Sequence, residues 1–332
     1  MTKKSQWSMQ WSLNLKNKSS SRKILWFVIL ATQVACTSET QKKIENDGIE
    51  LVVLGTIQDA GSPQIGCTKT CCKELLKKGN SNRKVVSLGV IDHDLKQQYL
   101  FEATPNITMQ IAHLQIMSNQ FKLPDGIFLT HAHIGHYTGL MYLGKEAMNS
   151  QSTDVFVMPD MFGFLTKNGP WNLLVENENI KLNLLRNGQA KSLNKNLSVT
   201  PIEVPHRDEY SETVGFRISG PNKSALFIPD IDKWVKWDRD IIQEINKVDY
   251  AFIDGTFFSG SEIGHRNISE IPHPFIEESM NRFESLAPEV RSKIYFIHFN
   301  HTNPVLNESS WESKEIEKKG FNLARMSDRF SL

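Results

Sequence analysis

Short apolar runs recur along the chain from residue 50 onward, separated by polar stretches that contain glycine and proline. Runs of this length, rich in β-branched and aromatic residues, are typical of strands. They predict strands at 50–55, 85–91, 98–103, 126–130, 154–158, 197–204, 213–219, 224–229, 249–253 and 293–299. Helical spacing of apolar residues predicts helices near 105–118, 137–149, 160–167, 238–246 and 274–286. Strands come first and then alternate with helices, which predicts sheets covered by helices in one layered domain over residues 50–332.

The start of the chain has the pattern of an export signal. A basic region is followed by an apolar run at 24–31 and by small residues before Cys36. The apolar run is too short to span a bilayer, and this order of segments is typical of secretory signals. A cysteine directly after an alanine resembles a bacterial lipobox, although Gln33 stands where an aliphatic residue is usual. We therefore predict a lipoprotein-type signal peptide over residues 1–36, with Cys36 acylated as the new N-terminus.

The same segment predicts where the protein resides. Residues 37–49 are polar and are expected to form a tether between the lipid anchor and the domain. We therefore expect a membrane-anchored lipoprotein of the cell envelope, on the periplasmic or extracellular side. The alternatives are an uncleaved signal anchor and a buried N-terminal helix.

The charge of the chain is the sum of two unlike parts. Lysine and arginine total 38 against 37 aspartates and glutamates, a net charge of +1. Residues 1–36 hold six of the basic residues and no acidic one, so the remainder has 32 basic and 37 acidic residues, a net charge of −5. A weakly acidic domain gives no electrostatic reason to expect nucleic acid as the main partner. The 19 glycines and 13 prolines, without a persistent heptad, exclude collagen-like and coiled-coil architectures.

Three histidines lie close together after the predicted strand at 126–130, in the run LTHAHIGH. His131 and His133 are two residues apart on an extended segment, so their side chains point the same way. His136 lies in the turn that opens the next predicted helix. Three imidazoles that converge at the end of a strand can bind a metal ion such as zinc.

Three later strands also end in residues that bind metals. These residues are His206, Asp230 and His298, with His301 just beyond the last strand. Strand ends on one edge of a sheet meet in space, so ligands from separate segments can share one centre. A single histidine is more often structural, but their recurrence at strand ends predicts a metal centre. Neutral imidazoles with one carboxylate suit zinc, iron or manganese.

In their order and spacing, the stretches THAHIGH, VPH, IPD and FIHFNH resemble the metallo-β-lactamase fold superfamily over about residues 50–305. The resemblance implies an α+β fold, a four-layer αββα sandwich of two mixed β-sheets flanked by helices, with a metal site on the shared edge of the sheets. Within the superfamily, the chain is most similar to the pyrroloquinoline quinone biosynthesis protein B family. The matching stretches are VLGTIQDAGSPQIGC, THAHIGHYTGLMYLGKEAM, FLTKNGPW, IDGTFF and FIHFNHTNP.

The resemblance also implies roles for the matching residues. One metal would be held by His131, His133 and His206, Asp230 would bridge, and His136 and His298 would bind a second metal. Gly135 departs from the superfamily motif, in which an aspartate binds the second metal and helps to position the water. A glycine has no side chain for either task. We therefore expect a second site that is weaker, empty, or completed by His301 or Asp59, although Asp59 is equally suited to a turn.

Cys67, Cys71 and Cys72 form a cluster, an odd number of thiols once Cys36 is lipidated. Three thiolates with a fourth ligand elsewhere predict a structural zinc site. The resembling family has a cysteine-rich zinc loop near this point, with different spacing. The alternatives are a disulfide such as Cys67–Cys72 with one free thiol, which an oxidising envelope favours, and simple free thiols.

Two further features lie near predicted strand ends and have two interpretations each. Asp254 follows a strand and is expected either near the edge of the site or in a turn or helix cap. His265 and His273 lie in a polar loop that either contacts substrate or is exposed without a role.

These features favour an exported metal-dependent hydrolase of an ester, amide or phosphoester in a small-molecule substrate. A metal-bound water with a lowered pKa would attack, Asp230 would bridge or orient it, and His298 or His301 would protonate the leaving group. The alternatives are an iron-dependent oxygenase, as the family resemblance implies, and a non-catalytic metal binder that lost activity with the aspartate at position 135. The leader argues against the oxygenase, because assembly of that quinone cofactor is expected in the cytoplasm. The sequence leaves the oligomeric state open.

Overall fold

The computed structural model describes residues 48–78, 82–264 and 271–332. The predicted signal peptide with Cys36, the tether up to residue 47, and His265 lie outside these ranges. Within them, no helix is both long enough and apolar enough to cross a membrane.

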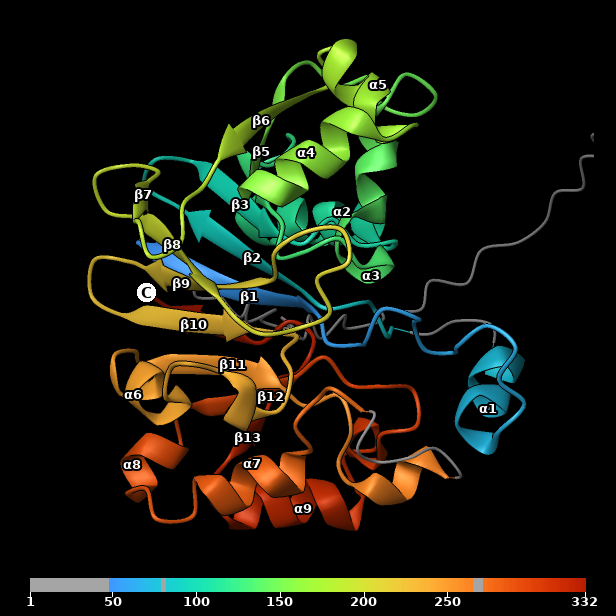
Figure 1. The fold of residues 1–332 in the computed structure, drawn as a ribbon, viewed down its shortest axis with the longest axis vertical. Helices are drawn as coiled ribbons and strands as arrows, with labels where there is room; N and C mark the ends of the chain where they lie inside the picture. The colour runs from blue at the N-terminus through green and yellow to red at the C-terminus, as the bar shows by residue number, and fades with distance from the viewer. Residues whose placement is uncertain (1–47, 79–81, 265–270) are drawn as a thin grey trace, which may run out of the picture. The chain divides into compact units, whose positions relative to one another are not determined.

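The described strands form two seven-stranded sheets with the same internal plan (Figure 1). The first has the order β14-β1-β2-β3-β4-β5-β6, and the second has the order β13-β12-β11-β10-β9-β8-β7. In each sheet, antiparallel pairing at one side changes to parallel pairing at the other. The first sheet comprises β1 (Ile49–Gly55), β2 (Ser87–Asp92), β3 (Gln97–Phe101), β4 (Gly126–Phe128), β5 (Thr153–Val157), β6 (Ile180–Leu184) and β14 (Arg329–Ser331). The second comprises β7 (Lys191–Ser192), β8 (Ser198–Glu203), β9 (Val214–Ser219), β10 (Ser224–Ile228), β11 (Tyr250–Asp254), β12 (Ile294–Ile297) and β13 (Asn322–Leu323).

Aromatic rings fill the space between the two sheets. The ring of Phe101 stacks on that of Phe128 with centroids 4.9 Å apart, and Phe216 meets Phe128 edge-on at 5.7 Å. Successive side chains of a strand point to opposite faces. In β10, Phe227 therefore packs between the sheets while Leu226 faces the helices outside. Burial on both faces explains why the sequence of such strands is a continuous apolar run.

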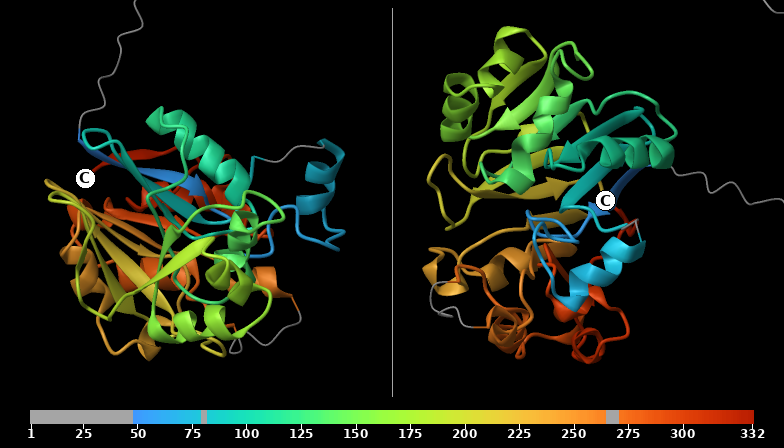
Figure 2. Two further views of the ribbon diagram at one scale, coloured as in Figure 1. Left: turned by 90° about the horizontal axis from the view of Figure 1, so that it is seen from above. Right: turned by 90° about the vertical axis from the view of Figure 1, so that its right-hand side faces the viewer.

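Helices cover the outer face of each sheet (Figure 2). Those on the first sheet are α2 (Ile107–Ser118), the 3₁₀ turn η1 (Thr138–Leu143), α4 (Pro159–Lys167) and α5 (Trp171–Glu176). Those on the second sheet are α6 (Ile241–Asn246), α7 (Ile276–Arg282) and α9 (Trp311–Lys318). Short helices α1 (Thr70–Lys78), α3 (Ile134–Tyr137) and α8 (Pro288–Arg291) complete the named α-helices. Helices, two sheets and helices form the four-layer αββα sandwich, which confirms the expected fold class.

The sequence located the long elements better than the short ones. Each of the ten predicted strands overlaps an observed strand, whereas α1, α5, α8, α9 and four strands (β6, β7, β13 and β14) were not predicted. The helix predicted near 137–149 is instead the single turn of α3 followed by η1. The backbone N–H of Gly139 donates to the carbonyl of Ala103 at 2.8 Å rather than continuing an α-helical ladder. The local sequence pattern gives no indication of that tertiary hydrogen bond.

Replacing a ring between the sheets should destabilise the whole fold. Phe128 is fully buried, so we expect Phe128→Ala to lower the free energy of unfolding by roughly 3–5 kcal/mol in chemical denaturation. Phe121 is 76% exposed and gives a matched control, for which we expect a change within about 0.5 kcal/mol. Equal effects of the two substitutions would contradict the assigned core.

Candidate metal centre

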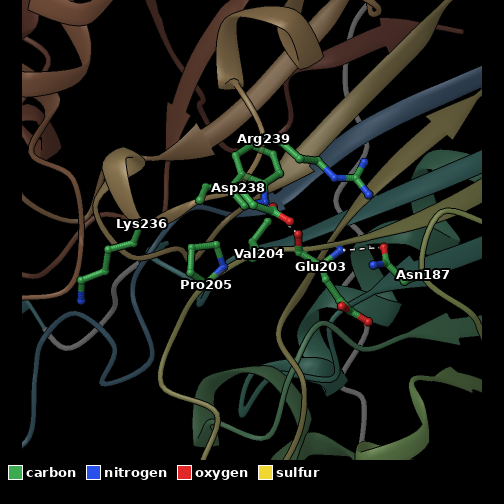
Figure 3. A pocket seen from close by; sticks show the side chains of 8 residues that line it. Asn187, Glu203, Val204, Pro205, Lys236, Asp238 and Arg239 are labelled. Atoms are coloured by element: carbon green, nitrogen blue, oxygen red, sulfur yellow. Dashed lines mark hydrogen bonds between the residues drawn. The ribbon is translucent and has the colours of Figure 1, made fainter.

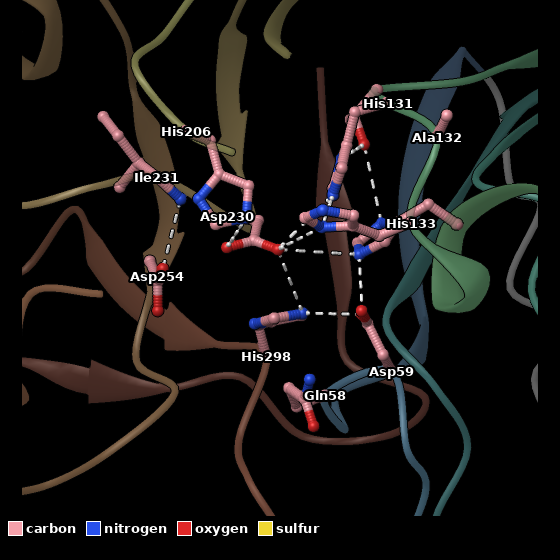
Figure 4. Close-up of polar contacts among 12 residues, drawn as sticks. Gln58, Asp59, His131, Ala132, His133, His206, Asp230, Ile231, Asp254 and His298 are labelled. Carbon is pink, nitrogen blue, oxygen red and sulfur yellow. Dashed lines mark hydrogen bonds and ion pairs between the residues drawn. The ribbon is translucent and has the colours of Figure 1, made fainter. Parts of the chain in front are cut away.

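The predicted metal-binding residues meet at one edge of the sandwich, on loops that leave strands of both sheets (Figure 4). These are Asp59 after β1, His131, His133 and His136 after β4, His206 after β8, Asp230 after β10 and His298 after β12. They form two groups that share Asp230, and in each group the ligand atoms lie within 4.8 Å of one another. The structure therefore brings together side chains that are up to 239 positions apart in the sequence.

The first group consists of three imidazoles and Asp230. The Nε2 of His131 lies 2.8 Å from the Nδ1 of His133 and 3.5 Å from the Oδ2 of Asp230. The Nε2 of His206 lies 3.2 Å from the Oδ1 of Asp230. Three ring nitrogens and one carboxylate gathered at this spacing fit the ligand number and ligand types of a zinc site.

The second group contains the carboxylate that the histidine motif lacks. The Oδ1 of Asp59 lies 2.8 Å from the Nε2 of His136 and 3.3 Å from the Nε2 of His298. The Oδ2 of Asp230 lies 3.9 Å from each of these two ring nitrogens. Of the two residues expected to complete the second site, Asp59 is therefore in place, whereas His301 lies elsewhere.

The position of Asp59 also accounts for the glycine in the motif. A Cβ at Gly135 would lie 2.5 Å from the Oδ1 of Asp59 and 2.6 Å from its Cα. Both distances are far below van der Waals contact, so a side chain at position 135 and Asp59 in its present place exclude one another. A carboxylate from the loop after β1 occupies the space that an aspartate at position 135 would need.

Most of these imidazoles make a second contact through their other ring nitrogen, Nδ1. Thr130 Oγ1 lies 2.8 Å from the Nδ1 of His131, and Thr256 Oγ1 lies 2.8 Å from the Nδ1 of His298. Carboxylates do the same for others: Asp232 is 3.3 Å from the Nδ1 of His206, and Glu102 is 3.3 Å from the Nδ1 of His136. Such partners fix the ring orientation and tautomer of metal-binding histidines.

Two residues of the centre have a left-handed backbone. The φ angles of Glu102 and His298 are +77° and +68°, in a region that residues with a side chain rarely adopt. Both side chains are fully buried. Strained backbone of this kind persists where the surroundings over-determine it, which is common at functional sites.

Burial and charge perturb the titration of the centre in opposite directions. Burial alone would raise the pKa of Asp230, but nearby imidazoles, His206 first, lower it well below its ordinary value. Burial lowers the pKa of His131 well below its ordinary value. Although burial also opposes the charged form of His206, Asp230 raises the pKa of that ring to about 9. A metal ion would compete with such protons, because ligating imidazoles must be neutral.

The donor atoms fit a bound cation. Among the described residues, the Nε2 atoms of His136 and His206 and the Oδ1 of Asp230 are buried without a hydrogen bond of acceptable geometry. Buried polar atoms ordinarily have partners. Three of the unpaired atoms therefore belong to the two groups, and imidazole nitrogens and carboxylate oxygens are donors that zinc, iron and manganese accept.

The structure adds residues to the centre whose role the sequence had left open or missed. Asp254, Asp230, His273 and His298 form a third buried group. The Nδ1 of His273 lies 2.8 Å from the Oδ2 of Asp254 and 3.1 Å from the Oδ1 of Asp230. Glu102 was not predicted, although an acidic residue at the end of an apolar strand was a usable signal.

The three cysteines of the described residues are free thiols and meet His301. The Sγ atoms of Cys67, Cys71 and Cys72 lie with a ring nitrogen of His301 within 4.8 Å of one another. Three thiols and one imidazole are the ligands of a structural zinc site. His301 is therefore placed in the cysteine group and not beside Asp230, so its expected role as a proton donor at the reaction centre has no geometric support. The alternative Cys67–Cys72 disulfide is not present.

Two polar pockets flank the segment that leads to His206. One, of about 320 Å³, reaches His206 and is lined by the carboxylates of Asp160, Asp208 and Glu212. The other, of about 270 Å³, lies beside Glu203 and includes Lys236, Asp238 and Arg239 (Figure 3). Their charged linings suit a polar small molecule better than an apolar one.

Comparison with known families agrees with this geometry. The beta-lactamase superfamily domain matches residues 97–299, more than half of the chain. The chain belongs to the beta-lactamase superfamily. The match includes both histidine-bearing segments of the first group, but Asp59 and the cysteines lie outside it.

Individual relatives confirm the narrower likeness. Coenzyme PQQ synthesis protein B of Nitrosococcus oceani is 27% identical over 304 residues, which cover 82% of this chain and 96% of that protein. The crystal structure of Zn²⁺-bound PqqB from Methylobacterium extorquens has a TM-score of 0.71 at 23% identity and covers 85% of this chain and 100% of that chain. A diphosphatase of the PhnP family has a TM-score of 0.58 at 18% identity, with 85% of this chain and 96% of that chain covered. The structural matches show a common fold, and together with the histidine and aspartate groups the zinc-bound neighbour supports metal binding here.

A side chain at position 135 should displace Asp59 and weaken the second group. We expect Gly135→Ala to reduce zinc affinity of that group by about 10–100-fold, the usual effect of disturbing the support of a ligand, while the first group keeps its metal. Competition titration with a chromogenic chelator measures both.

Gly163 in α4 provides the control for that substitution. A Cβ there would meet only the end of the Lys167 side chain, at 3.9 Å, so Gly163→Ala should leave zinc binding unchanged. Unaltered zinc binding by Gly135→Ala would contradict the assignment of Asp59 as a ligand.

Proposed function

We propose that this protein is a metal-dependent hydrolase with two metal positions that acts on an ester, amide or phosphoester bond of a polar small molecule. The observation that carries the proposal is the placement of Asp230. One of its carboxylate oxygens faces His206 of the first group, and the other faces His136 and His298 of the second. A carboxylate shared by two ligand groups is suited to hold two cations close together, the arrangement used for hydrolysis with metal assistance.

The chain's own residues have separable tasks in this proposal. When bound, metal ions would polarise the scissile group and lower the pKa of a coordinated water. His131, His133 and His206 hold the first position, and Asp59, His136 and His298 hold the second, with Asp230 common to both. Because one pocket reaches His206 and the other is lined by Pro205 just before it, substrate is expected to approach from that side.

His273 is better placed than His298 or His301 to protonate a leaving group. The Nε2 of His298 faces two carboxylates as a ligand does, and His301 lies among the cysteines. The Nδ1 of His273 contacts Asp254 and Asp230. Burial alone would lower the pKa of His273, but those two carboxylates raise it well above its ordinary value, which favours the protonated ring.

One specific observation favours a second candidate, an iron-dependent oxygenase. Several relatives that match nearly their full length are named coenzyme PQQ synthesis protein B. Imidazoles with carboxylates also bind iron in oxygenases. Metal identity separates the two candidates: iron together with substrate-dependent oxygen consumption would support the oxygenase, and zinc without it would support the hydrolase.

The hydrolase proposal predicts that activity depends on the shared carboxylate. The full chain should contain metal at both groups and hydrolyse at least one of a phosphodiester, a phosphomonoester and a carboxylic ester of 4-nitrophenol. Asp230→Asn should lower that rate by on the order of 100-fold, because both groups lose a charged ligand. Asp94→Asn changes an exposed carboxylate in the turn between β2 and β3, outside both groups and both pockets, and should leave the rate unchanged. Activity that survives Asp230→Asn would refute the proposal.

We also propose that the protein is anchored to a membrane of the cell envelope through lipidated Cys36. The support is the order of basic, apolar and small residues before that cysteine. In a bacterial host, the full chain should incorporate labelled fatty acid and fractionate with membranes, and Cys36→Ser should abolish the label. Cys67→Ser, the matched control, should retain it. Labelling of Cys36→Ser at wild-type level would overturn the anchor.

A further inference from the structure

The loop between β1 and α1 contacts one other segment both near its start and near its end, and between these points Ser62 accepts a hydrogen bond from Arg83 Nη1 at 2.9 Å. At its start, Gln58 N–H donates to the carbonyl of Phe299 at 2.9 Å, and Phe299 N–H donates to the carbonyl of Thr56 at 2.7 Å. At its end, Cys67 and the first turn of α1 meet His301. The partner segment is the same at both places, because Phe299 and His301 belong to one short turn after β12.

Each of the two segments carries ligands of both the second metal group and the cysteine group. The loop after β1 bears Asp59 of the second group and then the cysteines, and the turn after β12 bears His298 of the second group and then His301. The backbone pairing of Ile57 with Phe299 joins the two segments close in sequence to Asp59 and His298.

Apolar packing holds this loop only weakly. In α1, as far as the structure describes it, Cys72 is the single buried residue. Ile65 in the loop is 92% exposed, and Leu76 in α1 is 61% exposed. Figures 1 and 2 show α1 at the periphery of the ribbon, apart from the helices that cover the sheets. A segment with so little buried apolar surface depends on cross-links such as a metal site for its order.

We propose that the cysteine group is a positioning device for the second metal group: a metal ion held by Cys67, Cys71, Cys72 and His301 fixes the loop that presents Asp59 to His136 and His298. The inference rests on the second metal position proposed above and goes beyond it, because it makes binding at that position depend on ligands of a different site. The metal at the cysteines is itself remote from substrate, and its effect passes through the backbone between Asp59 and Cys67.

Zinc binding by the full chain tests the proposal, with competition titration against a chelator and zinc content after dialysis as readouts. Asp59→Asn should weaken the second group alone. Cys71→Ser should lose the ion at the cysteines and also weaken the second group, by about 10-fold or more, while the first group, which shares no loop with the cysteines, keeps its ion. Retention of that first ion shows that the variant is folded.

Matched variants separate loss of a ligand from disturbance of α1. His301→Ala removes a ligand from the other segment and should reproduce the effect of Cys71→Ser. His301→Cys supplies a fourth thiolate, which zinc accepts, and should restore both ions. Lys77→Ser alters α1 at an exposed position outside the group and should change neither.

The outcomes distinguish failure of this inference from failure of the proposed function. If Asp59→Asn weakens the second group but Cys71→Ser and His301→Ala do not, the coupling is refuted and the two-metal centre stands. If Asp59→Asn itself has no effect on zinc binding, the second metal position is refuted. Hydrogen exchange of residues 58–66 gives an independent readout: it should accelerate in Cys71→Ser and His301→Ala, and unchanged exchange would also overturn the coupling.

Discussion

The buried carboxylate of Asp230 is the constraint around which the centre is organised. Its side chain is 3% exposed, with ring nitrogens of His206 and His273 at 3.2 and 3.1 Å and others up to 4.0 Å away. A charge so far from water is very costly unless it is compensated. The surrounding imidazoles can compensate this charge by holding protons. Alternatively, they can release those protons and bind metal ions, which then compensate the charge. The depressed pKa of the carboxylate and the raised pKa of His206 express the first of these alternatives.

The sandwich makes this concentration of polar groups tolerable. Strands of both sheets end at one edge, so each ligand comes from a loop whose preceding strand is locked in a core on both faces. The supporting contacts of Thr130, Thr256 and Glu102 also come from residues just after strands, here β4, β11 and β3, which ties the ring orientations to the sheets and not to the loops alone. The left-handed backbone of Glu102 and His298 indicates that these strand ends are held firmly enough to keep unfavourable geometry.

Much of the fold and the first metal group could be predicted because both are encoded in local patterns. Apolar strands are short and continuous, and His131, His133, His206 and Asp230 each follow one directly. Asp59 was one of two residues expected to complete the second group. It could not be singled out because it lies four residues beyond the end of β1, in a glycine-containing turn of a kind that is common in loops. The indication was indirect: a glycine at position 135, which is required because Asp59 fills its space. The groups that His273 and His301 join could not be predicted in this way. The path of a loop decides which group a histidine joins, and no local sequence pattern encodes that path.

Moving a carboxylate from position 135 to position 59 changes what the second metal group depends on. An aspartate in the THAHIGH turn would be held by the same strand and helix as its neighbouring histidines. Asp59 instead belongs to a loop that precedes the region matching the superfamily domain, together with the cysteines. His301 lies just after the end of that region. The matched region alone therefore carries every ligand of the first group but an incomplete second one. The carboxylate that completes the second group therefore comes from a segment that precedes the shared domain, so the make-up of this group is set outside the region common to the superfamily.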